Sequence, residues 1–279
     1  MNPQPLPVTI DPAEPYVADL WGKKWAVDET AGRIQFLDSR FYEAAPGVYV
    51  PSVTTILEAY PKGAQYVEWL KKHGEDADQI RDEAGRRGSV VHNLTEDLDR
   101  GNAIHLMDER GGPRYKLTEW AMFERYVEFR RRYKDSTTVH AIELNMASAE
   151  LGYAGTLDRL MTIDGTTYLV DIKTSGAVHN AYWLQQAAYH QLLISTGLIA
   201  RLFPEGEVPE IRLAILWLNA KTRTDGKNGA IQGRGWQLLM QERPTADLLR
   251  VFNATRRLWL EEHAHETPKM TSYNLMHQL

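Results

Sequence analysis

An acidic residue on each side of a predicted β-hairpin, with a lysine nearby, is the part of the sequence best suited to chemistry. Asp-Gly at 164–165 separates two β-rich runs in GYAGTLDRLMTIDGTTYLVDIKTSG, residues 152–176, and this dipeptide is a strong signal for a two-residue hairpin turn. With that turn, Asp158 lies directly opposite Asp171 on one face of the sheet, with Cβ atoms about 5 Å apart. Lys173 is two residues beyond Asp171 and therefore points to the same face.

Two carboxylates this close repel each other by roughly 3 kcal/mol at an effective dielectric constant of about 20. A divalent cation offsets that repulsion, and hard oxygen ligands suit Mg²⁺ or Mn²⁺, as one ion or two. A lysine beside the ion can orient a water or stabilise charge on a phosphate, so the pattern predicts phosphodiester hydrolysis. The alternative is a solvent-facing hairpin with Asp and Lys on its wet side, and a longer turn would shift the register.

Three segments in this order resemble the core of the PD-(D/E)XK nucleases, particularly their RecB-like branch: GTLDRL, VDIKTS and a helix containing QQAAY. The resemblance implies that Asp158 and Asp171 bind the metal and that Lys173 assists the attacking water. It also implies that the main-chain carbonyl of Ile172, between acid and lysine, is a further metal ligand.

Gln185 and Tyr189 are four residues apart on a predicted helix, and therefore on one face. The RecB-like branch has a Gln and a Tyr at this spacing, which it associates with DNA contact and support of the active site. A polar pair on a surface helix is the alternative, and the adjacent Gln186 stays open as the functional glutamine.

A second helical segment, RRGSVVHNLTEDL, carries Gly88, His92 and Glu96 at four-residue steps on one face. The resemblance implies that His92 binds the metal, which it can do as a neutral imidazole, while Gly88 would permit close approach of backbone or phosphate. Glu96 either supports His92 or faces solvent. On the strand before GTLD, Glu143 is either a metal or supporting residue, as the resemblance implies, or an ordinary acidic residue of an amphipathic strand.

Basic and aromatic residues near these motifs are candidate contacts for unstacked bases and for the DNA backbone. They are Arg86, Arg87, Arg130, Arg131, Arg132, Tyr182 and Trp183. Each arginine cluster is equally well explained as a solvated helix face, and the net charge of -5 argues mildly against strong nonspecific nucleic-acid binding.

The elements that must position these residues follow from hydrophobic periodicity. We expect short strands between residues 25 and 55, helical structure over 64–100 with a break near Gly74, and a helix over 117–133. Strands at 138–146, 153–163, 166–173, 211–219 and 234–241 then alternate with helices at 180–196 and 245–263. This predicts an α/β (α+β) fold with a small mixed central sheet flanked by helices. We expect an extended segment at 1–18 and a single domain over 19–279, with an extension at 19–135 and a catalytic core of 136–279 plus the helix at 80–100.

Composition limits the alternatives. Without any cysteine the chain cannot hold a cysteine-ligated iron–sulfur cluster, and no apolar run approaches the about 20 residues that span a bilayer. We expect a cytoplasmic protein of a bacterial or phage-infected cell, without a membrane partner. No helicase P-loop is present, so any motor would be a separate protein.

The segment YVPSVTTIL, followed by a Trp-containing helix and the GSVVH element, resembles the mitochondrial genome maintenance exonuclease family and its phage and bacterial relatives. That resemblance implies a single-strand-preferring DNA exonuclease in replication, recombination or repair. An endonuclease with the same site and a non-catalytic DNA-binding recombination scaffold stay open, as do a homo-oligomer and a recombination partner protein.

Overall fold

The central sheet has five strands in the order β10-β9-β8-β7-β6, and all neighbours are antiparallel except β8 and β9, which run parallel. The strands are β6 (Thr137–Ser148), β7 (Tyr153–Ile163), β8 (Thr166–Lys173), β9 (Ile211–Arg223) and β10 (Ile231–Met240). The computed structural model describes residues 16–20, 23–27, 33–36, 39–45, 48–203, 208–223 and 231–263. The expected mixed sheet flanked by helices is confirmed.

The β7–β8 hairpin forms at the predicted dipeptide. Asp164 and Gly165 have φ values of +47° and +79°, the positive pair that a type I′ turn requires and that Asp-Gly accommodates. Pairing runs from Ile163↔Thr166 to Arg159↔Val170, which is the predicted register. The ladder then ends, one pair short of Asp158 and Asp171, and this early end shapes the site.

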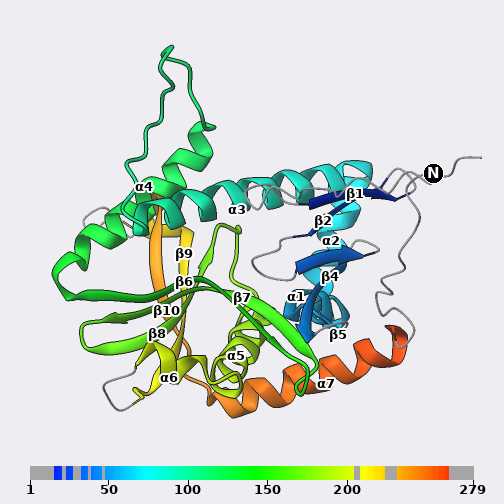
Figure 1. Ribbon diagram of the computed structural model, residues 1–279. Helices are drawn as coiled ribbons and strands as arrows, with labels where there is room; N and C mark the ends of the chain where they lie inside the picture. The colour runs from blue at the N-terminus through cyan, green and yellow to red at the C-terminus, as the bar shows by residue number, and fades with distance from the viewer. Residues whose placement is uncertain are drawn as a thin grey trace, which may run out of the picture.

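Helices cover both faces of the sheet (Figure 1). On one face α3 (Ala77–Asp99) and α4 (Leu117–Arg132) enclose apolar side chains of β7, β8 and β9. On the other, α5 (Asn180–Ser195) and α7 (Thr245–His263) pack over a larger core. The parallel β8–β9 pair is joined through α5 and α6 (Leu198–Leu202), because parallel neighbours need a long crossover.

The segment before α3 contains two small sheets. One pairs β1 (Tyr16–Leu20) with β2 (Lys23–Val27), and the other has the order β3-β4-β5. Its strands and the short helices that follow are β3 (Arg33–Phe36), β4 (Ser39–Ala45), β5 (Val48–Pro51), α1 (Val53–Ile56), η1 (Leu57–Ala59), α2 (Ala64–His73) and η2 (Gly74–Asp76). Pro51 ends the edge strand β5, where its missing N–H costs no ladder bond. Of the expected extended segment, 1–15 lies outside the described residues and 16–18 belongs to β1.

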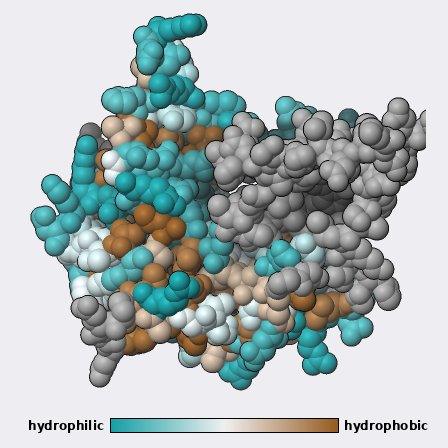
Figure 2. Space-filling view, in the orientation of Figure 1, coloured by the Kyte–Doolittle hydropathy of each residue, from teal (hydrophilic) through white to brown (hydrophobic). Residues whose placement is uncertain are grey.

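The connection between α3 and α4, residues 100–116, projects from the body of the molecule (Figure 1) and contains an isolated bridge between Met107 and Pro113. Figure 2 shows that hydrophilic side chains dominate this projection, while apolar side chains gather lower on the same face. The apolar residues that α4 buries are Met122, Phe123, Tyr126 and Phe129, whereas Leu117 at its first turn is exposed. Within the residues described, no helix combines the length and apolar character needed to cross a bilayer.

Candidate metal-binding and catalytic site

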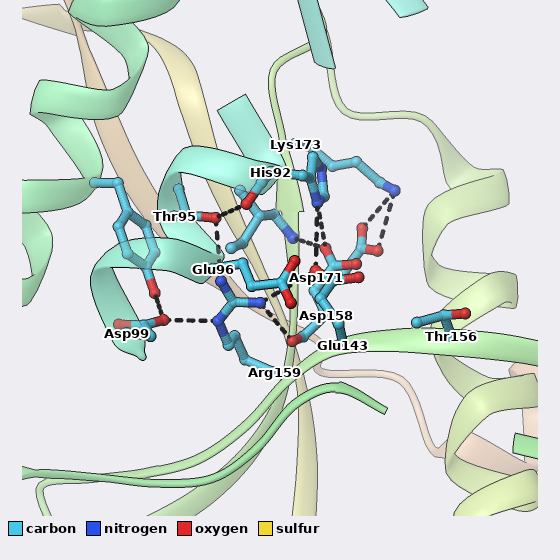
Figure 3. A network of polar contacts seen from close by, with 12 residues as sticks. His92, Thr95, Glu96, Asp99, Glu143, Thr156, Asp158, Arg159, Asp171 and Lys173 are labelled. Atoms are coloured by element: carbon cyan, nitrogen blue, oxygen red, sulfur yellow. Dashed lines mark hydrogen bonds and ion pairs between the residues drawn. The ribbon is translucent and has the colours of Figure 1, made fainter. Parts of the chain in front are cut away.

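Three side chains from three elements bring possible metal-donor atoms together. His92 of α3, Glu143 of β6 and Asp158 of β7 each offer one such atom, and these atoms lie within 4.8 Å of one another. His92 Nδ1 is 3.6 Å from Asp158 Oδ2 and 3.9 Å from Glu143 Oε1. Figure 3 shows the imidazole above the two carboxylates. One nitrogen and two oxygens in this arrangement form half or more of a divalent-cation site.

The strand geometry explains why the carboxylates meet. In the β6–β7 ladder, Ile142 pairs with Arg159 and Leu144 with Leu157, so Glu143 lies opposite Asp158. Glu143 has a φ of +46°, in the left-handed region that side-chain-bearing residues seldom adopt. This conformation is backbone strain at a cluster of charged groups, where such strain is typically found.

Asp158 marks the place where β7 and β8 separate. Its Oδ2 accepts a hydrogen bond of 2.7 Å from the main-chain N–H of Ile172, so a carboxylate replaces the backbone partner that a continued ladder would provide. In a strand, the N–H and C=O of one residue point to the same neighbouring strand. The Ile172 carbonyl is therefore directed towards the Asp158 side of β8.

Asp171 and Lys173 form a buried ion pair beside this cluster. The Lys173 ammonium donates to Asp171 Oδ1 at 3.0 Å and lies 2.8 Å from Oδ2. It also donates to Gln185 Oε1 at 3.1 Å and sits 4.5 Å from the ring centroid of Tyr182. Tyr182, expected as a DNA contact, thus places its ring against the lysine.

The Gln185–Tyr189 pair supports the lysine from α5. Gln185 Nε2 donates to the Tyr189 hydroxyl at 2.8 Å while its Oε1 accepts from Lys173. The Tyr189 ring in turn lies against Gly155, where an added Cβ would come within 2.3 Å of Cε1. Gln186 points elsewhere and donates to the Ala214 carbonyl of β9. Of the two adjacent glutamines, Gln185 is therefore the one at the site.

Burial and mutual charge perturb the ionisable groups. Burial raises the pKa of Asp171 to about 6, with Lys173 opposing the shift and Asp158 adding to it. Burial lowers the pKa of Lys173, but the Asp171 and Asp158 carboxylates outweigh burial and the net shift is upward. The pKa of His92 is likewise raised, because Asp158 and Glu143 outweigh its burial. Lys173 is consequently an ammonium at neutral pH, suited to stabilising negative charge rather than accepting a proton.

The residues present fit a divalent cation. An imidazole nitrogen and two carboxylate oxygens, those of His92, Glu143 and Asp158, lie within 4.8 Å of one another and are ligands that such a cation accepts. The Glu143 and Asp171 carboxylates are in contact with Arg159 and Lys173 respectively, and the Asp158 carboxylate accepts from a main-chain N–H. All three grouped donors belong to the metal set expected from the sequence, in which Glu143 was either a metal or a supporting residue. Asp171, also expected to bind the metal, forms an ion pair with Lys173.

The contacts of Glu96 and Gly88 bear on the roles that the sequence suggested for them. Glu96 accepts from Arg100 at 2.8 and 3.0 Å, and no contact to His92 is found in the described residues. Gly88 lies where a Cβ would be 3.5 Å from Thr174 Oγ1, an ordinary contact. Packing against Thr174 therefore does not require glycine at this position.

The arginines expected to contact DNA divide into paired and exposed groups. Arg86 is paired with Glu83 and with the buried Glu119, and Arg130 Nε is 3.2 Å from Asp99. These ion pairs hold helices α3 and α4 together, so both arginines have a structural explanation.

The remaining candidates vary in exposure. Arg131 is exposed, and exposed Arg132 places its guanidinium 5.9 Å from the Trp236 ring centroid. Arg87 is half-buried, and its Nε has no hydrogen-bond partner in the described part of the chain. Trp183 packs against the α5–α7 core, so only part of its ring surface is available to a ligand.

Sequence reasoning missed the network that lies behind the donors. Arg159 is fully buried and contacts Asp99, Thr95 and Glu143, while the Tyr126 hydroxyl donates to Asp99 (Figure 3). One signal was available. Strand alternation in GTLDRLMTI places Arg159 on the opposite face from Asp158, among apolar residues, and a charged residue in such a run needs buried partners.

No protein-family model matches this chain, and no curated protein matches it in sequence.

Proposed function

We propose that this protein is a divalent-metal-dependent DNA nuclease with a PD-(D/E)XK core of the RecB-like type, acting as an exonuclease on DNA ends or single strands. The observation that carries the proposal is the convergence of His92, Glu143 and Asp158 within 4.8 Å, next to the Asp171–Lys173 ion pair. The pair and the donors meet where β7 and β8 separate.

In the proposed site, His92, Glu143 and Asp158 would hold Mg²⁺ or Mn²⁺, with Asp171 and the Ile172 carbonyl next to them. A bound ion of this kind neutralises phosphate charge and lowers the pKa of coordinated water. His92 serves as a neutral ligand. Its raised pKa therefore predicts that metal binding weakens as the pH falls and the imidazole becomes protonated.

Lys173 supplies a fixed positive charge to the same site. Its ammonium is held by Asp171, Gln185 and the Tyr182 ring, so little reorganisation is needed when negative charge develops on a phosphate. Gln185 and Tyr189 orient the ammonium through the hydrogen bonds described above. Substrate selection is assigned to the exposed basic and aromatic residues, of which Arg131 and Arg132 are the least constrained.

Timed digestion of end-labelled single- and double-stranded DNA, with Mg²⁺, Mn²⁺ or chelator, tests the proposal. We expect metal-dependent release of short products, and a fall of roughly 100-fold or more in Asp158→Asn and Lys173→Met. The matched control is Asp82→Asn, on the exposed side of α3, which should retain the wild-type rate.

A covalently closed single-stranded circle separates the alternatives. Cleavage of the circle would show endonuclease activity with the same site. Tight DNA binding without any metal-dependent cleavage would favour a non-catalytic scaffold and overturn the nuclease proposal. Wild-type rates in both site variants would remove the assignment of the catalytic residues.

A further inference from the structure

Arg159 uses almost all of its hydrogen-bonding capacity inside the protein. Its side chain has no exposed surface, and its three nitrogens donate to four acceptors. Nε donates to Asp99 Oδ2 at 2.7 Å and Nη2 to Thr95 Oγ1 at 3.1 Å, both on α3. Nη1 donates to the Glu143 carboxylate at 3.1 Å and to the Asp158 carbonyl at 2.7 Å. A guanidinium has five N–H donors in a rigid fork, so four of them are fixed here.

These acceptors connect the guanidinium to every element that carries a metal donor (Figure 3). Nη1 reaches the side chain of Glu143 and the main chain of Asp158 directly. The connection to His92 runs through Thr95, whose hydroxyl accepts from Arg159 and donates to the His92 carbonyl at 2.8 Å. One buried side chain therefore joins α3, β6 and β7 behind the cluster.

The charge of Arg159 does not depend on Glu143 alone for compensation. Asp99 is buried beside it, and also pairs with Arg130. Glu143 has a strained backbone, and its carboxylate accepts from Arg159 Nη1 at 3.1 Å and lies 3.9 Å from His92 Nδ1. The ion pair with Arg159 therefore bears on the placement of the Glu143 carboxylate as well as on the charge of Arg159.

We propose that Arg159 is a positioning residue that fixes the Glu143 carboxylate for metal binding, with Asp99 and Thr95 anchoring the arginine to α3. This inference rests on the metal site of the proposed function. Lysine at position 159 would keep the charge but lose the fork, and could not bond Asp99, Thr95 and Glu143 in the same geometry.

The test is a double-variant cycle on Mn²⁺ affinity, measured by calorimetry without DNA. Arg159→Lys should weaken Mn²⁺ binding by about 10- to 100-fold, the range found for residues behind metal ligands, and Glu143→Gln, which alters a ligand itself, by at least as much. Since Arg159 acts through Glu143, the double variant should bind no more weakly than Glu143→Gln alone. The matched control is Tyr126→Phe, which removes a hydrogen bond to Asp99 without touching Glu143, and should change the affinity less than about twofold.

A measurement on the wild-type chain avoids any loss of folding in the arginine variant. In ¹⁵N-arginine NMR spectra, saturating Mg²⁺ should shift the Arg159 Nη resonances and leave Nε, bonded to Asp99, nearly unchanged. Three results would each overturn the positioning role alone. They are Nη resonances that do not shift at saturation, wild-type Mn²⁺ affinity in Arg159→Lys, and an equal loss of affinity on Arg159→Lys in wild type and in Glu143→Gln. A wild-type protein that binds neither Mn²⁺ nor Mg²⁺ would overturn the proposed function together with it.

Discussion

Replacing Asp171 by asparagine should make the metal-free protein more stable at neutral pH. The carboxylate is 3% exposed, and burial, despite the opposing Lys173, raises its pKa from 3.8 to about 6. A difference of about 2 pKa units corresponds to roughly 3 kcal/mol at 1.36 kcal/mol per unit. The fold bears this cost whenever the group is ionised, and a neutral amide of nearly the same shape removes it.

The pH dependence has a definite sign. Between pH 3.8 and about 6 the folded state holds a proton on Asp171 that the unfolded state has lost, so wild-type stability falls as the pH rises through this window. Asp171→Asn lacks that titration. The difference in unfolding free energy between the variant and wild type should be absent below pH 3.8, grow between pH 3.8 and about 6, and be complete above pH 6.

Urea unfolding of wild type and Asp171→Asn in chelator, at a series of pH values, measures the difference in their free energies of unfolding. All other titratable groups are present in both proteins, so the difference reports on Asp171. Mn²⁺ at 100 times its Kd should then narrow the difference, since it stabilises the wild type by about 2.7 kcal/mol and the variant by less. A variant that is less stable than wild type at pH 7 in chelator would refute the reasoning. It would mean that the ion pair with Lys173 contributes more to stability than the burial of Asp171 costs.

Gly155→Ala should destabilise the fold by about 1–3 kcal/mol in urea unfolding, as overpacking does, because its Cβ would lie 2.3 Å from the Tyr189 ring; unchanged stability would mean that the ring moves freely. Gly88→Ala meets only an ordinary contact and should stabilise its helix by up to about 1 kcal/mol. If a phosphate approaches this backbone, the same variant should raise the KM for DNA, and an unchanged KM would exclude that role. Glu143→Gln should lower Mn²⁺ affinity in calorimetry at least about tenfold, while Glu96→Gln, whose partner is Arg100, should not; equal effects would contradict the donor set.

Local chemistry made the hairpin predictable. Asp164 and Gly165 tolerate the two positive φ values of a type I′ turn, and a two-residue turn determines the register of everything that follows. The sequence ranges of β7 and β8 were therefore correct at both ends. The contact between Asp171 and Lys173 also follows from strand alternation alone, and needs no knowledge of the rest of the chain.

The identity of the third donor could not be predicted in the same way. Whether Glu143 reaches Asp158 depends on the pairing of β6 with β7, which contains a register shift between Val139 and Ala141. It also depends on a left-handed backbone at Glu143, for which a glutamate gives no local signal. The Arg159–Asp99 contact joins residues 60 positions apart, and turn or periodicity rules do not operate over that distance.

The early end of the β7–β8 ladder connects these observations. Had pairing continued by two steps, to Leu157 and Ile172, backbone groups of β7 would have satisfied the Ile172 N–H, and Asp158 would have had no such bond to hold its carboxylate. Ending the ladder removes backbone hydrogen bonds from the sheet and leaves charged groups close together, both of which reduce stability. The buried arginine behind the strands offsets part of that loss by joining α3 to β6 and β7, next to the point where β7 and β8 separate. A site of this construction is expected to gain stability from its ion, so metal binding and resistance to unfolding should rise together.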